Sequence, residues 1–209
     1  MSGAEERGRG GFPDYPVITE ADPGFVRYVT AMRRLGDLSV SAAPDDDVWA
    51  AAADQIEKLV AELEPAVAPE GAAPAGRAPS LPGMGSLLLP PFRVVGFDTD
   101  GVEMRGQFSR FHVGGNSAVH GGVLPLLFDW LCGMVVHGAQ RPISRTAYLK
   151  VDYRHVTPID TPLVVRGRVA RVEGRKSFVT GELVEPRGDQ EILCAELDAL
   201  MVQLLPGQP

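Results

Sequence analysis

The segment Asn116–Trp130 constrains the fold more than any other part of the chain. It reads Asn-Ser-Ala-Val-His-Gly-Gly-Val-Leu-Pro-Leu-Leu-Phe-Asp-Trp, and Asp129 is the only charged residue between Val123 and Val136. An apolar run of this length exceeds a typical strand, and the two glycines before it suit a helix start. The sequence therefore predicts a buried helix of about four turns that carries a single carboxylate.

Asp129 and the turn before the helix, His120-Gly121-Gly122, indicate chemistry. A buried, unpaired carboxylate is costly, so its presence in an apolar helix favours a functional role. Helix N-termini offer free N–H donors, and residues without side chains let a carbonyl oxygen approach those donors closely. The turn is therefore a candidate oxyanion site. The alternative is a surface helix with one exposed Asp after a glycine-rich turn.

The spacing between these two features has a geometric consequence. Asp129 follows His120 by nine residues. At 100° and 1.5 Å per residue, Asp129 lies on the opposite side of the helix and roughly 13 Å along it. One helix cannot bring both to one carbonyl group, whereas two helices packed antiparallel can. The sequence therefore predicts a homodimer, or a dimer of dimers, in which facing subunits complete each site.

Three segments in a fixed order carry a resemblance to a known family. They are His120-Gly121-Gly122 with Asp129 nine residues later, Thr146-Ala-Tyr-Leu-Lys-Val-Asp-Tyr153-Arg154, and Val172-Glu-Gly-Arg175-Lys176. Over about residues 84–205 the sequence resembles the hotdog-fold acyl-CoA thioesterases of the PaaI-like group, which includes the human thioesterase superfamily members. The resemblance implies an acyl-CoA substrate and an α+β hotdog fold, in which an antiparallel sheet wraps a central helix.

The resemblance also implies roles for individual residues. Asp129 would act as general base or nucleophile, the Gly121 N–H would polarise the thioester carbonyl, and the Thr146 hydroxyl would help to place water. Many relatives carry an asparagine six residues before the histidine, whereas Asn116 stands four residues before His120. The chain departs from the family pattern at this position, although Asn116 is kept as a candidate substrate contact.

The other candidate residues have more than one interpretation. His120 could take part in catalysis or could simply hold the turn in shape, and Gly122 could contact substrate through its backbone. A threonine such as Thr146 is also common in strands for its β-propensity alone. The cations expected at a strand end and in a tight turn could bind the phosphates of coenzyme A or could be ordinary solvated residues; they are Arg154, Arg175 and Lys176.

Composition and motifs exclude several classes of protein. The formal net charge of −7 and the pI near 5.1 argue against broad nucleic-acid binding, which needs a basic surface. The start of the chain lacks the apolar core of a signal peptide and no stretch reaches the length of a membrane span, so we expect a cytoplasmic enzyme. Cys132 and Cys194 form no CxxC pair, and we expect both to be buried thiols.

The remaining titratable residues do not suggest a cofactor. His112, His137 and His155 show no metal-ligand spacing, and HExxH is absent from the sequence. We therefore expect no metal and no cofactor, since coenzyme A is part of the substrate. A GxSxG motif is also absent, which argues against a serine hydrolase.

The chain divides by composition into an N-terminal helical extension with a flexible linker, residues 1–83, and a hotdog domain, residues 84–209. Asp22-Pro23 predicts the start of a helix that Gly36 can end. A second helix is predicted from the acidic run Asp45-Asp46-Asp47 to about Glu64, with an apolar face that packs on the main domain or a partner. The Ala, Pro and Gly content of residues 65–82 predicts a mobile loop.

The rest of the chain reads mostly as strands. Residues 93–97 and 102–108 flank Asp98-Thr-Asp-Gly101, a hairpin signal with a glycine suited to positive φ. After the helix, strands are predicted at residues 145–156, 163–172, 177–184 and 191–204. Consecutive strands joined by short turns pair antiparallel, so this ββαββββ order favours a sheet that wraps the helix on physical grounds as well.

The favoured function is hydrolysis of acyl-CoA to a free carboxylic acid and coenzyme A. An acyl-CoA-binding or regulatory protein with the same fold and little turnover is the main alternative, because fold does not fix function. A hotdog dehydratase would need an Asp and His pair placed for proton transfer, and the sequence shows no convincing spacing for one.

Overall fold

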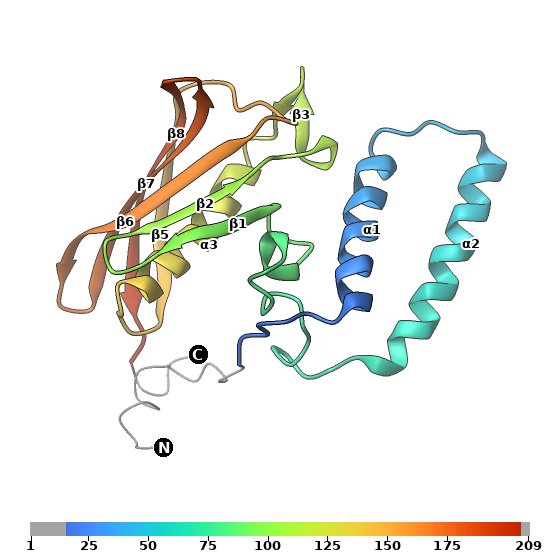
Figure 1. The fold of residues 1–209 in the computed structure, drawn as a ribbon, viewed down its shortest axis with the longest axis horizontal. Helices are drawn as coiled ribbons and strands as arrows, with labels where there is room; N and C mark the ends of the chain where they lie inside the picture. Colours follow the sequence, from blue (N-terminus) through green and yellow to red (C-terminus); the bar gives the residue numbers. More distant parts are fainter. Residues whose placement is uncertain (1–15, 206–209) are drawn as a thin grey trace.

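The computed structural model describes residues 16–205, which form a curved sheet, a helix inside its curve and a pair of N-terminal helices (Figure 1). The longer helices are α1 (Pro23–Ser39), α2 (Asp46–Leu63) and α3 (Val123–Gly138). The predicted lack of a signal peptide concerns the first residues of the chain, which lie outside the described part. Between residues 16 and 205, no helix is long and apolar enough to cross a membrane.

Six strands make the main sheet in the order β1-β2-β6-β7-β8-β5, and each neighbouring pair is antiparallel. The strands are β1 (Phe92–Phe97), β2 (Val102–Gly106), β5 (Ser144–Tyr153), β6 (Leu163–Glu173), β7 (Lys176–Arg187) and β8 (Gln190–Gln203). The predicted order of two strands, a helix and four strands is confirmed for this sheet. Pairing of consecutive strands fails once, because β5 pairs with β8 and lies at the sheet edge, away from β6.

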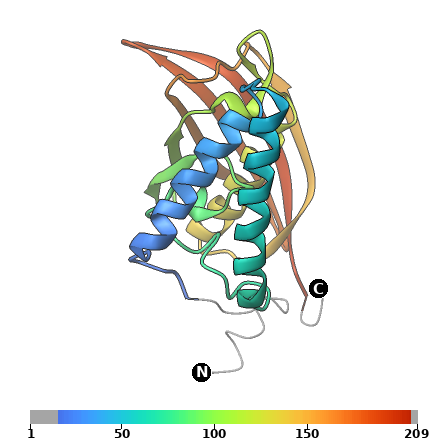
Figure 2. The same ribbon diagram turned by 90° about the vertical axis from the view of Figure 1, so that its right-hand side faces the viewer.

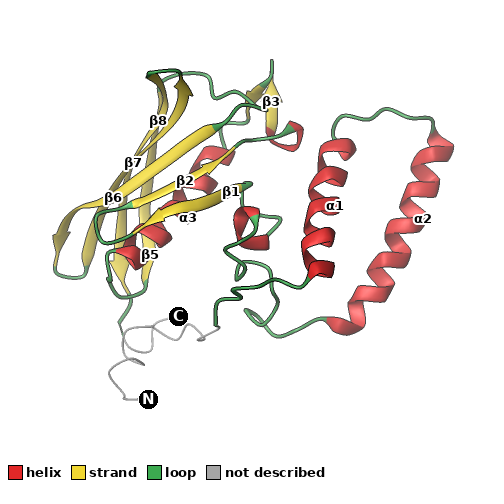
Figure 3. Ribbon diagram, viewed as in Figure 1, coloured by secondary structure: helices red, strands yellow, loops and turns green. Residues whose placement is uncertain are grey.

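The sheet curves around α3, as Figure 3 shows. The helix buries the side facing the sheet through Leu124, Leu127, Phe128, Leu131, Cys132, Val135 and Val136. Two glycines on the sheet make this close packing possible. A Cβ on Gly167 of β6 would lie 2.9 Å from Leu131 Cδ2, and one on Gly181 of β7 would lie 3.2 Å from the same atom. The glycines therefore let the helix approach the middle of the sheet.

The predicted hairpin joins β1 to β2. The Asp98 N–H donates to the Gly101 carbonyl at 3.1 Å, and Asp98 Oδ1 accepts from the N–H groups of Asp100 and Gly101. The expected positive φ at Gly101 is wrong. A Cβ at this position would lie 2.7 Å from the Gly167 carbonyl oxygen, so close approach to β6 explains the glycine.

A second, two-stranded sheet was not predicted. It consists of β3 (Val113–Gly115) and β4 (Ala118–Val119), and it follows the short 3-10 helix η4 (Arg110–His112). Ala118 also forms a bridge with Pro158, and the Val119 N–H donates to the Thr157 carbonyl at 2.9 Å. These contacts attach the segment before α3 to the loop that follows β5.

The helix α1 begins at Pro23 as predicted, although the Asp22 side chain makes no capping hydrogen bond. It continues to Ser39, so the prediction that Gly36 ends it is wrong. A Cβ on Gly36 would lie 3.2 Å from Cδ2 of Phe111, and the neighbouring Asp37 carboxylate accepts a 3.1 Å hydrogen bond from the Phe111 N–H. The glycine therefore serves the packing of α1 against η4.

The helix α2 has acidic residues in its first turn, as predicted, but it buries none of its residues. It lies beyond α1 in Figure 1, and Figure 2 shows the two helices side by side. The predicted apolar face does not pack on the main domain, since Trp49 and Ile56 are 41% and 43% exposed. Packing of this face on a partner stays a prediction.

The loop of residues 65–82 is mostly irregular, as predicted, but its second half is packed. Ala78 and Leu81 are buried in a small cluster with Val29 of α1. The Ile18 N–H also donates to the Arg77 carbonyl at 2.8 Å. This part of the loop is therefore held against α1. The division of the chain at residues 83 and 84 stays a prediction.

Candidate active site

Asp129 lies in the middle of α3, on a side of the helix that the sheet leaves largely uncovered and that only the edge strand β5 approaches. Its side chain is exposed in the described chain, which corrects the prediction of a buried carboxylate. The physical reason is that the sheet covers only one side of the helix. Gly133 lies one turn later on the uncovered side, and a Cβ there would meet no atom within 4 Å. The candidate carboxylate therefore stands on an open helix face.

Thr146 contacts this carboxylate from β5. The threonine Oγ1 donates a 2.7 Å hydrogen bond to Asp129 Oδ1. The register of β5 against β8 shifts between Thr146 and Tyr148, and Thr146 pairs with the buried Met201. Thr146 Oγ1 also lies 3.4 Å from Met201 Sδ, which places the hydroxyl on the concave side of the sheet. The structure thus brings together two of the candidate catalytic residues.

The His120-Gly121-Gly122 turn has well-defined hydrogen bonds. The His120 carbonyl accepts from the Val123 N–H at 2.9 Å, and His120 Nδ1 accepts from the Gly122 N–H at 3.1 Å. The Gly121 carbonyl accepts a 2.8 Å hydrogen bond from the Tyr153 hydroxyl. Within residues 16–205, the Gly121 N–H has no hydrogen-bond acceptor. This N–H is therefore available to a ligand, and the His120 ring supports the turn.

The two parts of the candidate site lie apart within one chain. Tyr153 contacts Gly121 at one end of β5, and Thr146 contacts Asp129 near the other end. A seven-residue separation along a strand corresponds to roughly 20 Å. Along α3 the eight residues from Gly121 to Asp129 span roughly 12 Å, so one small carbonyl group cannot contact both residues of the same chain.

The candidate phosphate-binding cations also lie at two separate places, one near the glycine turn and one near Thr146. Arg154 follows Tyr153 and lines a cavity of about 300 Å³ together with Gly121. Its guanidinium group forms ion pairs with Asp152 and Glu196. Lys176 pairs with Val202, which also pairs with Arg145 at the start of β5. Arg175 Nη1 donates to the Gln203 carbonyl at 3.0 Å. Arg175 and Lys176 therefore lie near the Thr146 end, and Arg154 lies near the glycine turn.

Asn116 occupies the tip of the β3–β4 turn. Its φ is 49°, and that of the next residue, Ser117, is 56°. Asparagine tolerates this left-handed conformation better than most residues with a side chain, which gives a local reason for its presence. A contact between Asn116 and substrate stays a prediction.

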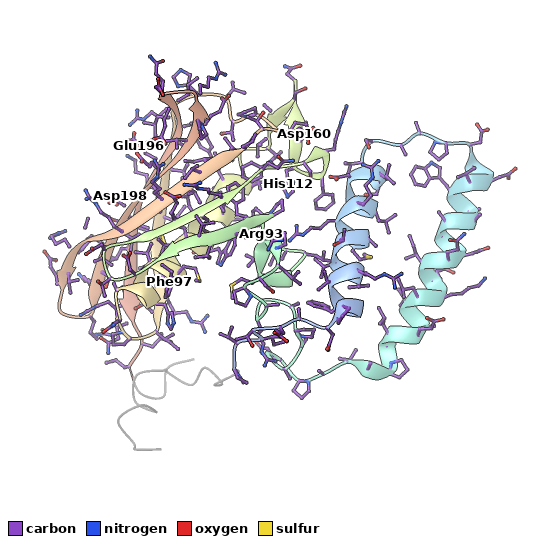
Figure 4. All side chains as sticks on the ribbon, viewed as in Figure 1. Arg93, Phe97, His112, Asp160, Glu196 and Asp198 are labelled. Carbon is purple, nitrogen blue, oxygen red and sulfur yellow. The ribbon has the colours of Figure 1, made fainter. Side chains whose placement is uncertain are left out.

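The outer side of the sheet carries paired charges. Arg166 forms ion pairs with Glu103, Glu182 and Glu191, and the hydrogen bonds that it donates to Glu191 and then to Glu103 raise the pKa of its guanidinium group. Glu196 and Asp198 lie on this side as well (Figure 4). Asp198 accepts a hydrogen bond from the Tyr148 hydroxyl. Since these charges have partners, this surface is explained by ion pairing within the sheet.

Both cysteines are buried free thiols, as predicted. Burial, followed by the nearby Asp129 charge, raises the pKa of Cys132 to about 12. A thiol with this pKa remains protonated near neutral pH and is a poor nucleophile. Within the described part of the chain, no group of three His, Cys, Asp or Glu side chains could hold a metal ion.

Tyr153 contacts the glycine turn, and the sequence predicted no role for this residue. It belongs to the segment that carried the family resemblance, but the pattern did not show that its hydroxyl reaches Gly121, 32 residues away in the chain. The only sign of this contact in the sequence was the position of the tyrosine, at the end of the predicted strand that also carries Thr146. The contact depends on the path of the loop after β5, which a single sequence does not define.

Comparison with known proteins shows which proteins this chain is similar to. The model of the thioesterase superfamily matches residues 116–192, which include the glycine turn, Asp129 and Thr146. The acyl-coenzyme A thioesterase THEM4 of Rattus norvegicus is 32% identical over 91 residues, which are 44% of this chain and 38% of that protein. THEM4 of Xenopus laevis is 30% identical over 95 residues, covering 42% and 38%. The chain thus spans 38% of the length of these curated relatives.

Solved structures share the fold. A thioesterase superfamily protein superposes with a TM-score of 0.73 at 25% identity, covering 90% of this chain and all of that one. A Streptococcus mutans protein bound to acetyl CoA has a TM-score of 0.50 at 18% identity, covering 55% of this chain and 90% of that one. The antiparallel sheet around α3 is therefore a hotdog fold, and the predicted α+β class is confirmed.

Proposed function

We propose that this chain, which carries a hotdog domain of the thioesterase superfamily, hydrolyses acyl-CoA thioesters to a free carboxylic acid and coenzyme A. The observation that carries the proposal is the Asp129 carboxylate on the open face of α3, with the Thr146 hydroxyl hydrogen-bonded to it. The family match and the similarity to THEM4 acyl-coenzyme A thioesterases support the reaction. The acetyl CoA bound to the Streptococcus mutans protein supports the substrate class.

The reaction needs a donor for the carbonyl oxygen and a group that activates water. The free Gly121 N–H would donate to the thioester oxygen and stabilise the negative charge that develops there. Asp129 would take a proton from water while the oxygen of that water attacks the carbonyl carbon. The carbon–sulfur bond then breaks, and the sulfur takes a proton and leaves as the thiol of coenzyme A. Thr146 would hold the carboxylate and the attacking water in place.

A direct attack by Asp129 is the second route for the same residue. The carboxylate would form a mixed anhydride with the acyl group, coenzyme A would leave as the thiol, and water would hydrolyse the anhydride. Both routes require the carboxylate at position 129 and an oxyanion donor. The predicted effect of replacing Asp129 is therefore the same for both.

The separation of Gly121 from Asp129 supports a composite site between two subunits. If two α3 helices pack antiparallel through their open faces, the glycine turn of one subunit lies near Asp129 of the other. The open side of α3 supports this arrangement, since apolar residues such as Leu126 and Met134 are only partly covered in one chain. A homodimer is accordingly part of the proposed function, and a dimer of dimers would repeat the same site.

The same arrangement provides a place for the rest of the substrate. Arg154 of the subunit that supplies Gly121, and Arg175 and Lys176 of the facing subunit, would then border one site. Guanidinium and ammonium groups there would bind the phosphates of coenzyme A, while the acyl group would lie in an apolar channel beside α3. Gly122 and Asn116 would contact the substrate at the rim.

The test is a panel of acyl-CoA substrates with increasing chain length and one aromatic acyl group, assayed by release of free thiol. We expect release well above the spontaneous rate for at least one class, and the Asp129→Asn protein serves as the matched control. Binding of acyl-CoA without release of thiol would overturn the proposal and favour the binding or regulatory alternative. The cytoplasmic location stays a prediction from the sequence.

A further inference from the structure

Tyr153 links the end of β5 to the glycine turn. Its hydroxyl donates a 2.8 Å hydrogen bond to the carbonyl oxygen of Gly121. Tyr153 pairs with the buried Ala195 of β8, so its side chain leaves the sheet on the concave side, as that of Thr146 does at the other end of the strand. The strand that contacts Asp129 through Thr146 therefore also contacts the turn that offers the free N–H.

The turn has few other constraints on the peptide group between Gly121 and Gly122. The peptide group before it is held by the hydrogen bond from the Val123 N–H to the His120 carbonyl. The next peptide group has its N–H bound to His120 Nδ1 and its carbonyl bound to Tyr153. Both residues of this peptide lack side chains, so their backbone torsions are intrinsically broad. Tyr153 supplies the contact from outside the turn that limits them.

We propose that Tyr153 is a positioning residue for the oxyanion donor, an inference that rests on the proposed function. Its hydroxyl holds the Gly121 carbonyl, which limits the backbone torsions of Gly121 and so restrains the residue whose N–H is the proposed donor. Alignment of a donor with a developing oxyanion determines how much the donor contributes, because hydrogen bonds weaken steeply with angle. As a positioning residue, Tyr153 would act through Gly121, the residue whose carbonyl it holds.

A purely structural role makes different predictions. The Tyr153 side chain is 55% exposed, and Gly121 is exposed too. Water can therefore replace the lost hydroxyl at the Gly121 carbonyl, and removal of the hydroxyl leaves no buried polar group without a partner. We therefore expect the thermal midpoint of Tyr153→Phe to stay close to that of the parent protein. A structural role would lower this midpoint, whereas a positioning role lowers kcat and speeds amide exchange in the turn.

The chain offers a matched control on the same strand. The Tyr148 hydroxyl donates a 2.7 Å hydrogen bond to Asp198 Oδ1 on the outer side of the sheet. Tyr148→Phe and Tyr153→Phe each remove one exposed hydroxyl group and one hydrogen bond from β5. Only Tyr153→Phe removes a contact with the glycine turn.

The experiment measures kcat and KM for acyl-CoA hydrolysis and amide hydrogen exchange at residues 113–124 in both variants. For Tyr153→Phe we expect kcat to fall about 10-fold or more, because a misaligned donor loses part of its roughly 100-fold contribution. KM should stay within about twofold. The Gly122 and Val123 amides should exchange faster than in the parent protein. Tyr148→Phe should match the parent in all of these measurements.

The possible results separate the inference from the proposed function. A parent protein that hydrolyses no acyl-CoA would overturn the proposed function, and the positioning of the turn would still be tested by the exchange of Gly122 and Val123. Exchange that is unchanged in Tyr153→Phe would overturn the inference. In an active enzyme, so would an unchanged kcat or an effect confined to KM.

Discussion

The hydroxyl oxygen of Thr146 lies 2.7 Å from Oδ1 of Asp129, and this hydrogen bond joins β5 to the middle of α3. It uses Oδ1 of an exposed carboxylate, and within residues 16–205 no donor is hydrogen-bonded to the other oxygen. A carboxylate held by one donor keeps a defined orientation while it can still accept a proton or attack a carbonyl. The pair is therefore suited to activate a nucleophile at the open face of α3, where the proposed second subunit would pack.

Replacement of Asp129 by Asn tests the role of the carboxylate. The amide has nearly the same shape and can still accept a hydrogen bond from Thr146, but it cannot act as base or nucleophile. We expect the rate of thiol release to fall about 100-fold or more, since loss of a general base costs 10²–10⁴-fold. Circular dichroism and the oligomeric state should match the parent. A rate within twofold of the parent would remove Asp129 from the mechanism.

Replacement of Thr146 separates the hydroxyl group from strand propensity. Thr146→Ala should lower kcat about 10-fold with little change in KM, because it removes a hydrogen bond that orients the carboxylate. Thr146→Ser retains the hydroxyl group and should keep most of the activity, so it is the matched control. If the alanine variant changes KM alone, Thr146 contacts substrate and does not position the carboxylate.

The sequence predicted much of this geometry because local patterns determine it. The apolar run after Gly122 predicted α3, and runs of alternating apolar and polar residues separated by turn residues predicted the strands. The exposure of Asp129 matches the alternative interpretation and not the favoured one, since an apolar helix does not reveal which of its sides the sheet of the same chain covers. The separation of Arg154 from Lys176 depends on strand register, and it becomes visible only when β5 and β7 are both paired with β8.

The candidate phosphate contacts can be tested with a truncated substrate. Removal of both charges in Arg175→Gln/Lys176→Gln should raise KM for acyl-CoA about 10-fold or more, with little effect on a short pantetheine thioester, which lacks the nucleotide phosphates. Arg105→Gln on β2 is the matched control, because this exposed guanidinium pairs with Glu103 on the outer side of the sheet. Equal effects on both substrates would exclude phosphate binding at Arg175 and Lys176.

Gly167 tests the packing of α3 into the sheet. A Cβ at this position would lie 2.9 Å from Leu131 Cδ2 and 3.1 Å from Val135 Cγ2. Gly167→Ala should therefore lower the free energy of unfolding by about 1–3 kcal/mol, as overpacking of a core does. Gly188→Ala, where a Cβ would meet no atom within 4 Å, shows the cost of losing a positive-φ glycine alone. Denaturant unfolding curves give both free energies of unfolding. A Gly167→Ala protein with the same free energy of unfolding as the parent would contradict this packing.

The composite site predicts rescue between two inactive variants. Asp129→Ala removes the carboxylate, and Gly121→Val places a side chain where the carbonyl oxygen would approach. A Cβ at Gly121 would lie 3.6 Å from the Tyr153 hydroxyl oxygen, an ordinary contact, so the valine variant is expected to fold. Each variant alone should be nearly inactive. A heterodimer of the two would contain one site with both defects and one intact site.

Thiol release by the co-expressed variants tests the central claim most directly. If subunits associate at random, about half of the dimers carry one working site, which predicts roughly a quarter of the parental activity. Purification through two different affinity tags isolates the heterodimer, which should then show about half of the parental activity per dimer. A purified heterodimer as inactive as either variant alone would contradict a site completed by facing subunits.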